Sequence, residues 1–384
     1  MRIVAGLALV TGLVGCGRIG YDPVTDSPLD APDDELDGPP SACGAPVMLV
    51  DLEDSASPAP ATYVLDATET STGFVVAWSA GHGRVETAGV AIDGAGRIAV
   101  LQSHSTLYEL EATAISTAAV GDRVLVAADD GSSIQLAPLD HLGYERGSMK
   151  TIDDVRGVGH DFMAVKPSAE GIVVLGGAAT STAAFTRDLD AHPITGPDQV
   201  FARATAGSGA AAVAGGYVML SRQPAGAENC DVVPVDTSIV ATAASQEIVM
   251  TCNHASVSGA AEGAKALAAW NGTNDAVWIA GGPVGALPSS PRAVYQGDAA
   301  TSASDPRLAV KGNDYYFWYS YRVAGTRLGY AIVDADGAEL RAPQVVHTAP
   351  DLVAYDLISH GDKGYLIWLE AGTRDQLWLM PICE

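Results

Sequence analysis

An apolar segment of five residues recurs along this chain at a nearly constant spacing. Its copies begin at positions 74, 123, 172, 217, 266, 315 and 365, which are 49, 49, 45, 49, 49 and 50 residues apart. Short apolar runs bounded by turn residues are typical of β-strands, and self-similarity at a fixed period indicates a repeat architecture. The period therefore constrains the chain to an array of similar β-units.

Each copy lies within a longer meander of short strands. A weaker apolar run precedes it and two more follow after turns, which around the first copy are residues 62–65, 89–93 and 97–101. Four antiparallel strands in about 48 residues correspond to one blade of a β-propeller. We predict an all-β fold, a seven-bladed β-propeller of four-stranded antiparallel blades. The alternative, an array of two-sheet sandwiches, does not repeat one meander seven times.

The two ends of the repeat region indicate how the ring closes. The seventh unit, residues 351–384, stops after its third strand at 376–380, so it lacks a fourth. Residues 45–50 resemble the fourth strands of other units, notably 342–346. We therefore expect the N-terminal strand to complete the last blade, which would leave no open sheet edge.

The N-terminus has the features of an export signal. Arg2 precedes the apolar run 3–10, which is too short to span a bilayer and has the pattern of a secretory signal. The run ends in Leu13-Val-Gly-Cys16, which resembles the lipobox of bacterial lipoproteins. That resemblance implies that residues 1–15 are a signal peptide and that Cys16 carries the lipid. Such an anchor holds a protein on the periplasmic or outer-surface face of a bacterial membrane. The alternative is an ordinary signal peptide with a cysteine there by chance.

Residues 16–42 form an acidic, proline-rich segment. Positions 21–40 contain five prolines and seven acidic residues. Such a segment cannot bury enough apolar surface to fold, so we expect an extended tether before the propeller domain at 43–384. Calcium binding is the alternative, but the spacing and glycine of a loop site are absent. The opening 16–22 followed by such a tether is similar to the start of many myxobacterial lipoproteins, which implies a location and not an activity.

The net charge restricts the partners. The chain has 21 Lys and Arg residues against 46 Asp and Glu residues, a formal charge of −25. A surface this acidic repels nucleic acid and anionic lipid headgroups. We therefore expect no nucleic-acid partner, and a membrane contact only through the lipid on Cys16.

The remaining four cysteines test the predicted closure. Cys43 precedes the closing strand and Cys383 ends the strand with which it must pair. Cys230 opens the third strand of the fourth unit and Cys252 ends the fourth strand. We predict the disulfides Cys43–Cys383 and Cys230–Cys252, the first being worth about 5 kcal/mol in the chain-entropy model. Four free thiols are the alternative, and a zinc site is disfavoured because there is no Cys-x-x-Cys spacing.

Linear signatures of catalysis and of metal or cofactor binding are missing, so we predict no catalytic residue, no metal and no cofactor. His160-Asp161 and His360-Gly-Asp362 stand near the starts of two units, where a general base or a metal ligand is conceivable and a polar turn is favoured. Residues 93–94, 129–131 and 334–337 combine Asp with Gly, which suggests hairpin turns more than calcium sites. The aromatic run 315–321 is expected to pack in the core and not to bind sugars.

Three functional hypotheses remain. The first is a lipoprotein whose propeller is a non-enzymatic binding or scaffold module for protein or glycan. The second is a polysaccharide-acting hydrolase or lyase, which two carboxylates and a histidine converging on the central channel would support; a channel lined by Ala, Val and Thr would count against it. The third is a structural part of an envelope assembly, which a large exposed apolar rim would favour.

Overall fold

The computed structural model divides the chain into two units, Met1–Asp37 and Gly38–Glu384, and the residues it describes all belong to the second. It describes residues 44–382 except 53–62, 81–82, 110, 132, 154–161, 168–171, 178–181, 189, 191, 193–198, 202–203, 214, 223–228, 237–245, 252, 260–264, 272–275, 284–290, 297–302, 312–315, 324–325 and 373.

All regular elements in these described residues are β-strands, and they form sheets in chain order. The first sheet contains β2 (Leu65–Glu69), β3 (Gly73–Ala80), β4 (Arg84–Ile92) and β5 (Ile98–Tyr108). The second contains β6 (Ala114–Val120), β7 (Arg123–Asp129), β8 (Ser133–Asp140) and β9 (Lys150–Asp153). The third sheet contains β10 (Phe162–Pro167), β11 (Ile172–Gly177), β12 (Thr182–Arg187) and β13 (Gln199–Phe201). Another contains β22 (Ala303–Lys311), β23 (Tyr316–Val323), β24 (Arg327–Asp334) and β25 (Glu339–Thr348). A fifth combines β26 (Leu352–His360), β27 (Lys363–Ala371) and β28 (Asp375–Pro381) with β1 (Val47–Leu52).

The sixth sheet has eight strands. Its members are β14 (Ala204–Val213), β15 (Gly216–Arg222), β16 (Asn229–Asp236), β17 (Gln246–Thr251), β18 (Asn253–Gly259), β19 (Lys265–Asn271), β20 (Ala276–Pro283) and β21 (Arg292–Gln296). Its two halves, β14–β17 and β18–β21, are joined by one parallel pair between Ser208 and Ser256.

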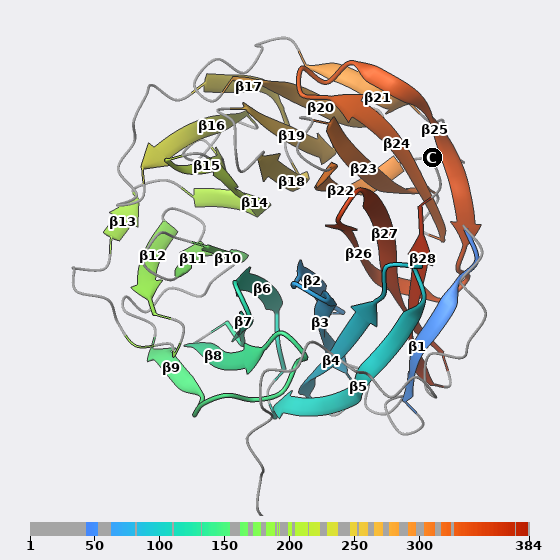
Figure 1. Cartoon of the computed structure of the whole chain (residues 1–384). Helices are drawn as coiled ribbons and strands as arrows, with labels where there is room; N and C mark the ends of the chain where they lie inside the picture. Colours follow the sequence, from blue (N-terminus) through green and yellow to red (C-terminus); the bar gives the residue numbers. More distant parts are fainter. Residues whose placement is uncertain are drawn as a thin grey trace, which may run out of the picture. The chain divides into compact units, whose positions relative to one another are not determined.

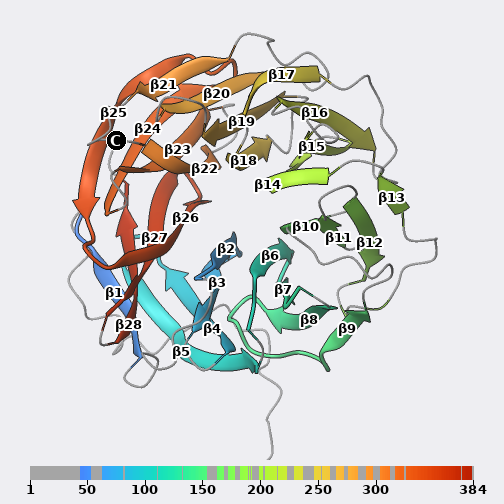
Figure 2. The same ribbon diagram turned by 180° about the vertical axis from the view of Figure 1, so that it is seen from behind.

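The sheets follow one another around a common centre, as in a β-propeller (Figures 1 and 2). The first strand of each run of four lies innermost, and these strands contact one another in the closed cycle β2, β6, β10, β14, β18, β22, β26 and back to β2. We call these strands the inner wall. An all-β propeller is therefore the architecture of this part of the chain.

The structure differs from the expected seven separate four-stranded sheets in the number of sheets. Within the described residues, five sheets have four strands and one has eight. The difference arises because β14 and β18, neighbours on the inner wall, approach closely enough to form a backbone pair at Ser208 and Ser256. Both strands are rich in Ala, Gly and Ser, which allow two backbones to come close.

The predicted closure by the N-terminal strand is confirmed. β1 pairs antiparallel with β28, with Val47 opposite Leu379 and Leu52 opposite Asp375 (Figure 1). The last sheet thus takes three strands from one end of the chain and one from the other. Ring closure of this kind removes the free edge that β28 would otherwise present.

The core lies between adjacent sheets. Residues 74–78 of β3 are fully buried, and their side chains alternate between two neighbours. Phe74, Val76 and Trp78 pack with the sheet that contains β27, whereas Val75 and Ala77 pack with the sheet that contains β7. Because both faces of such a strand are covered, its sequence is continuously apolar and stands out at the repeat period.

The Asp-Gly segments form turns, as predicted. The Asp93 Oδ1 accepts hydrogen bonds from the amides of Ala95 and Arg97, each at 2.8 Å, and Gly96 has a φ of 80°. Asp334 repeats this arrangement between β24 and β25, where its Oδ1 accepts amides at 3.0 and 2.8 Å. These carboxylate oxygens stabilise the turn, because an Asp side chain can bond its own backbone two to four residues on.

Candidate functional site

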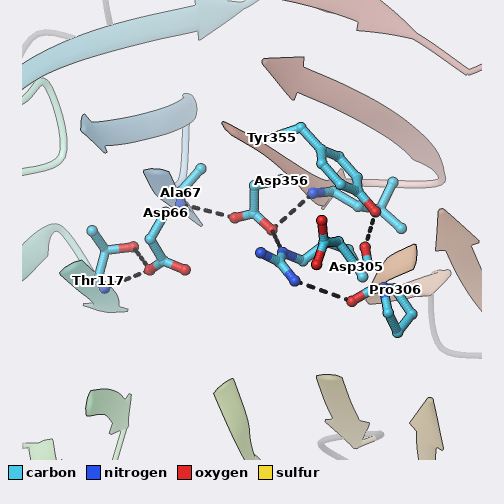
Figure 3. Close-up of polar contacts among 9 residues, drawn as sticks. Asp66, Ala67, Thr117, Asp305, Pro306, Tyr355 and Asp356 are labelled. Carbon is cyan, nitrogen blue, oxygen red and sulfur yellow. Dashed lines mark hydrogen bonds and ion pairs between the residues drawn. The ribbon is translucent and has the colours of Figure 1, made fainter. Parts of the chain in front are cut away.

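Four neighbouring strands of the inner wall carry a group of charged and polar side chains. We call this group the inner-wall cluster, and it comprises Asp66 of β2, Thr117 of β6, Asp305 and Arg307 of β22, and Tyr355 and Asp356 of β26. Figure 3 shows its carboxylates lying between these strands. It is the place where the two ends of the ring meet.

Asp356 is a buried carboxylate of the cluster. Its Oδ2 accepts a hydrogen bond from the Ala67 amide of β2 at 3.0 Å, and its Oδ1 accepts one from the Leu357 amide at 2.8 Å (Figure 3). The Arg307 Nε lies 3.8 Å from the Asp356 Oδ1. One carboxylate therefore connects three consecutive strands of the inner wall, β22, β26 and β2.

Asp66 makes a similar connection at the next position. Its Oδ2 accepts hydrogen bonds from the Thr117 amide at 2.6 Å and from the Thr117 hydroxyl at 2.7 Å. The innermost strand of a blade has no further strand on its inner side, so its amides need another acceptor. The two aspartates supply that acceptor across two successive junctions between blades.

The two carboxyl groups also influence one another. Burial raises the pKa of Asp356 from 3.8 to about 7, the negative charge of Asp66 adds to this rise, and Arg307 and the backbone hydrogen bonds oppose it. Asp356 is consequently partly protonated near neutral pH. A carboxyl pair in which one member holds a proton is an arrangement that acid–base catalysts use.

Arg307 is positioned by an irregularity in β22. The pairing of β22 with β23 shifts between Ser304 and Arg307, and Asp305 there has a φ of 49°. Among the described residues, no other residue besides glycine has a positive φ. Such bulges change the direction of a side chain, and strained backbone tends to occur at functional sites.

Contacts from β26 and from β22 itself hold this irregular segment of β22. The Tyr355 hydroxyl donates a hydrogen bond to the Asp305 carbonyl, and the Arg307 Nη1 donates one to the Pro306 carbonyl at 3.2 Å. The Arg307 guanidinium carbon lies 5.5 Å from the centre of the Tyr355 ring. Arg307 is therefore held at a fixed place with its side chain 29% exposed.

A second set of contacts crosses the same junction between β26 and β2. The Glu69 Oε1 lies 3.1 Å from the His360 Nδ1 and accepts the Gly361 amide at 3.1 Å. The His360 ring also packs edge-on against Phe74. His360 is the last residue of β26 and the turn at Gly361-Asp362 follows it, while His160-Asp161 lies outside the described residues.

The sequence did not point to the inner-wall cluster. Two carboxylates converge as the hydrolase hypothesis requires, but their cationic partner is Arg307 and not a histidine. Cys16, Cys43, Cys252 and Cys383 lie outside the described residues, and Cys230 is in β16. In the part of the chain that is described, no group of three or more His, Cys, Asp or Glu residues could hold a metal ion. That part also contains no helix long and apolar enough to cross a membrane.

Comparison with known proteins yields structural neighbours only. No family model matches the chain, and no curated protein matches it. One similar solved structure is the Dos1 propeller, at 10% identity and a TM-score of 0.45, over 79% of this chain and 75% of that one. Another is BBS1N in complex with ARL6DN, at 13% identity and a TM-score of 0.47, over 78% of this chain and 87% of that one. The propeller assignment rests on the sheet topology described above.

Proposed function

We propose that this chain is a lipid-anchored, extracytoplasmic lipoprotein whose β-propeller is a binding or scaffold module for a protein or a glycan. The segment that ends in Cys16 and the acidic tether after it support the anchor and the location. We count β14–β17 and β18–β21, the two halves of the eight-stranded sheet, as separate blades, because a single backbone pair joins them.

The observation that carries the binding proposal is the inner-wall cluster. Arginine, aspartate, tyrosine and threonine side chains from four strands meet where the rest of the inner wall is rich in Ala, Ser, Thr and Val. Polar groups that converge at one place on an otherwise simple surface are typical of a binding site. The bulge at Asp305, with its φ of 49°, adds to this, because β-bulges often change the direction of a side chain next to a functional site.

Two measurements test the proposal. Cys16→Ser should move the protein from the membrane fraction to the soluble extracytoplasmic fraction, and wild-type behaviour of that variant would contradict the anchor. Immobilised full-length protein should retain a ligand from glycan and envelope-protein libraries. Absence of any retained ligand in both libraries would contradict the binding module.

The register of β1 with β28 supports the first disulfide as part of the proposal. Val47 stands opposite Leu379, and equal steps of four residues outward along the sequence from this pair reach Cys43 and Cys383. Directly opposite positions in antiparallel strands are close enough for a disulfide. For Cys230–Cys252, Cys230 stands opposite Ile248 and its neighbour Asn229 stands opposite Thr251, so this second bond also stays a prediction.

One observation favours the alternative, a hydrolase acting on polysaccharide. Asp356 is partly protonated near neutral pH and lies beside Asp66, as a general acid lies beside a base. If this is the function, the wild-type protein releases reducing ends from an envelope polysaccharide, and both Asp356→Asn and Asp66→Asn abolish the release. Equal rates in the wild type and the two variants would exclude these residues as catalysts.

A further inference from the structure

Four large side chains form one row across the last blade, from the inner wall to the outer rim. Tyr355 of β26 stands opposite Trp368 of β27, which in turn stands opposite Trp378 of β28. Trp378 stands opposite Met48 of the closing strand β1. Directly opposite residues of antiparallel strands share one face of the sheet, with Cβ atoms about 4.5 to 5.5 Å apart. The Trp368 and Trp378 rings are accordingly stacked, with centroids 6.3 Å apart.

Burial decreases along this row toward the rim. Tyr355 and Trp368 are buried, Trp378 is partly buried, and Met48 is 44% exposed. β1 is the edge strand of its sheet, so in the described part of the chain no further strand of that sheet continues the row. Met48 therefore covers the outer side of Trp378 with one part of its side chain and presents the other part to solvent.

An accessible thioether can be oxidised. Met48 and Met149 are 44% and 49% exposed, whereas Met219 and Met380 are buried. A hydroperoxide converts an exposed methionine to its sulfoxide. The sulfur lone pair attacks the outer peroxide oxygen, a sulfur–oxygen bond forms, and the oxygen–oxygen bond breaks. The proton of the attacked oxygen passes to the other oxygen, which leaves as water or an alcohol. Sulfur loses two electrons and the peroxide gains them.

The place of Met48 gives this oxidation a structural consequence. Within its sheet β1 pairs only with β28, and that pairing shifts between Met48 and Val50. The sulfoxide is polar, so the contact between this side chain and the Trp378 ring becomes unfavourable. The loss occurs where the ladder is already irregular. Packing of β1 on β28 should therefore weaken, although Leu49 and Leu52 still anchor β1 in the core between the last and the first sheet.

We propose that Met48 is a site of reversible oxidation by hydroperoxides, and that the sulfoxide loosens the strand that closes the ring. This inference goes beyond the proposed binding function and does not depend on the lipid anchor. Methionine sulfoxide is reduced back by methionine sulfoxide reductases, so the closure can be restored.

Hydrogen exchange measured by mass spectrometry tests the proposal on the full-length protein. After treatment with hydrogen peroxide, peptide mapping quantifies the sulfoxide at Met48, and exchange is compared with that of untreated protein. We expect oxidation of Met48 to raise the exchange rates of the β1 and β28 amides at least threefold and to leave those of β7 unchanged. Unchanged exchange in β1 and β28, an equal rise in all three strands, or an unoxidised Met48 when Met149 is oxidised would each overturn the proposal.

Two variants serve as matched controls. Met48→Leu conserves the volume of the side chain and removes the sulfur, so peroxide should leave the exchange of β1 and β28 unchanged in this variant. Met149 precedes β9, outside the closing strand. Met149→Leu should therefore respond to peroxide as the wild type does. An equal response of the Met48→Leu variant and the wild type would assign the effect to another group and overturn the role of Met48.

Reduction of the oxidised wild type supplies a test that needs no variant. Methionine sulfoxide reductases act on the sulfoxide and not on the oxidised forms of cysteine. Treatment with these enzymes should return the exchange of β1 and β28 to that of untreated protein. Faster exchange that persists after Met48 has been reduced would contradict the proposal.

Discussion

The Ala67 amide donates a hydrogen bond of 3.0 Å to the Asp356 Oδ2 across 289 positions of sequence. This bond joins the innermost strands of the first and the last blade, β2 and β26. The pairing of β1 with β28 closes the same ring at its outer side. One inner side-chain contact and one outer strand pairing therefore act together to hold the two ends of the repeat array.

Removing this carboxylate should destabilise the ring. Asp356→Ala leaves the part-buried Ala67 amide and the buried Leu357 amide without this acceptor, which costs about 2 to 4 kcal/mol. Chemical denaturation of the full-length protein measures the free energy of unfolding. Asp336→Ala is the control, because the Asp336 side chain is 67% exposed, and it should change stability by less than about 0.5 kcal/mol. Equal effects of the two variants would rule out a special role of Asp356.

The raised pKa of Asp356 makes stability depend on pH. Between the ordinary pKa of 3.8 and the folded-state pKa of about 7, the folded protein binds a proton that the unfolded chain releases. The free energy of unfolding therefore falls as pH rises through this interval, by about 1.4 kcal/mol per unit and about 4 kcal/mol at most. Asp66 and Arg307 face the Asp356 carboxyl group, and both residues are left unchanged when the wild type is compared with an Asp356 variant.

The measurement is a series of denaturation curves from pH 4 to pH 8 for the wild type and for Asp356→Asn. The difference in free energy of unfolding between the two proteins should change steadily over the interval, because the amide cannot titrate. A difference that is constant from pH 4 to pH 8 would show that Asp356 has an ordinary pKa.

The period of the apolar strands and the closure by β1 could be predicted because both depend on burial that the sequence records. The innermost strand of the first blade could not be predicted in this way. Residues 62–65 were expected to form it, whereas β2 spans Leu65–Glu69. Its residues include Asp66, which bonds Thr117 of β6, and Glu69, which bonds the turn after β26, so the segment lacks the apolar pattern of a strand.

The candidate site was missed for a related reason. Asp66, Arg307 and Asp356 are far apart in the chain and come together only when the ring closes. The direction of Arg307 depends on a bulge at Asp305, and a β-bulge leaves only a weak trace in a single sequence, here a proline inside a strand. The turns were predicted correctly because Asp and Gly determine them locally.

The turn between β4 and β5 allows a test within one loop. Gly96 has a φ of 80°, which side chains disfavour, so Gly96→Ala should lower the free energy of unfolding by about 1 to 2 kcal/mol. Gly94 lies two residues earlier and has no atom within 4 Å of the place where a Cβ would stand. Gly94→Ala should therefore be neutral or slightly stabilising. Thermal unfolding distinguishes the two variants, and an equal loss of stability in both would contradict the turn geometry.

The central claim is that a lipid-anchored chain closes its propeller with its own N-terminal strand. Non-reducing peptide mapping by mass spectrometry, on protein purified from membranes, tests it most directly. We predict a lipid mass on the peptide that begins at Cys16, and a linked peptide pair that contains Cys43 and Cys383. An unmodified Cys16 would contradict the anchor, and free thiols at Cys43 and Cys383 would contradict the covalent closure.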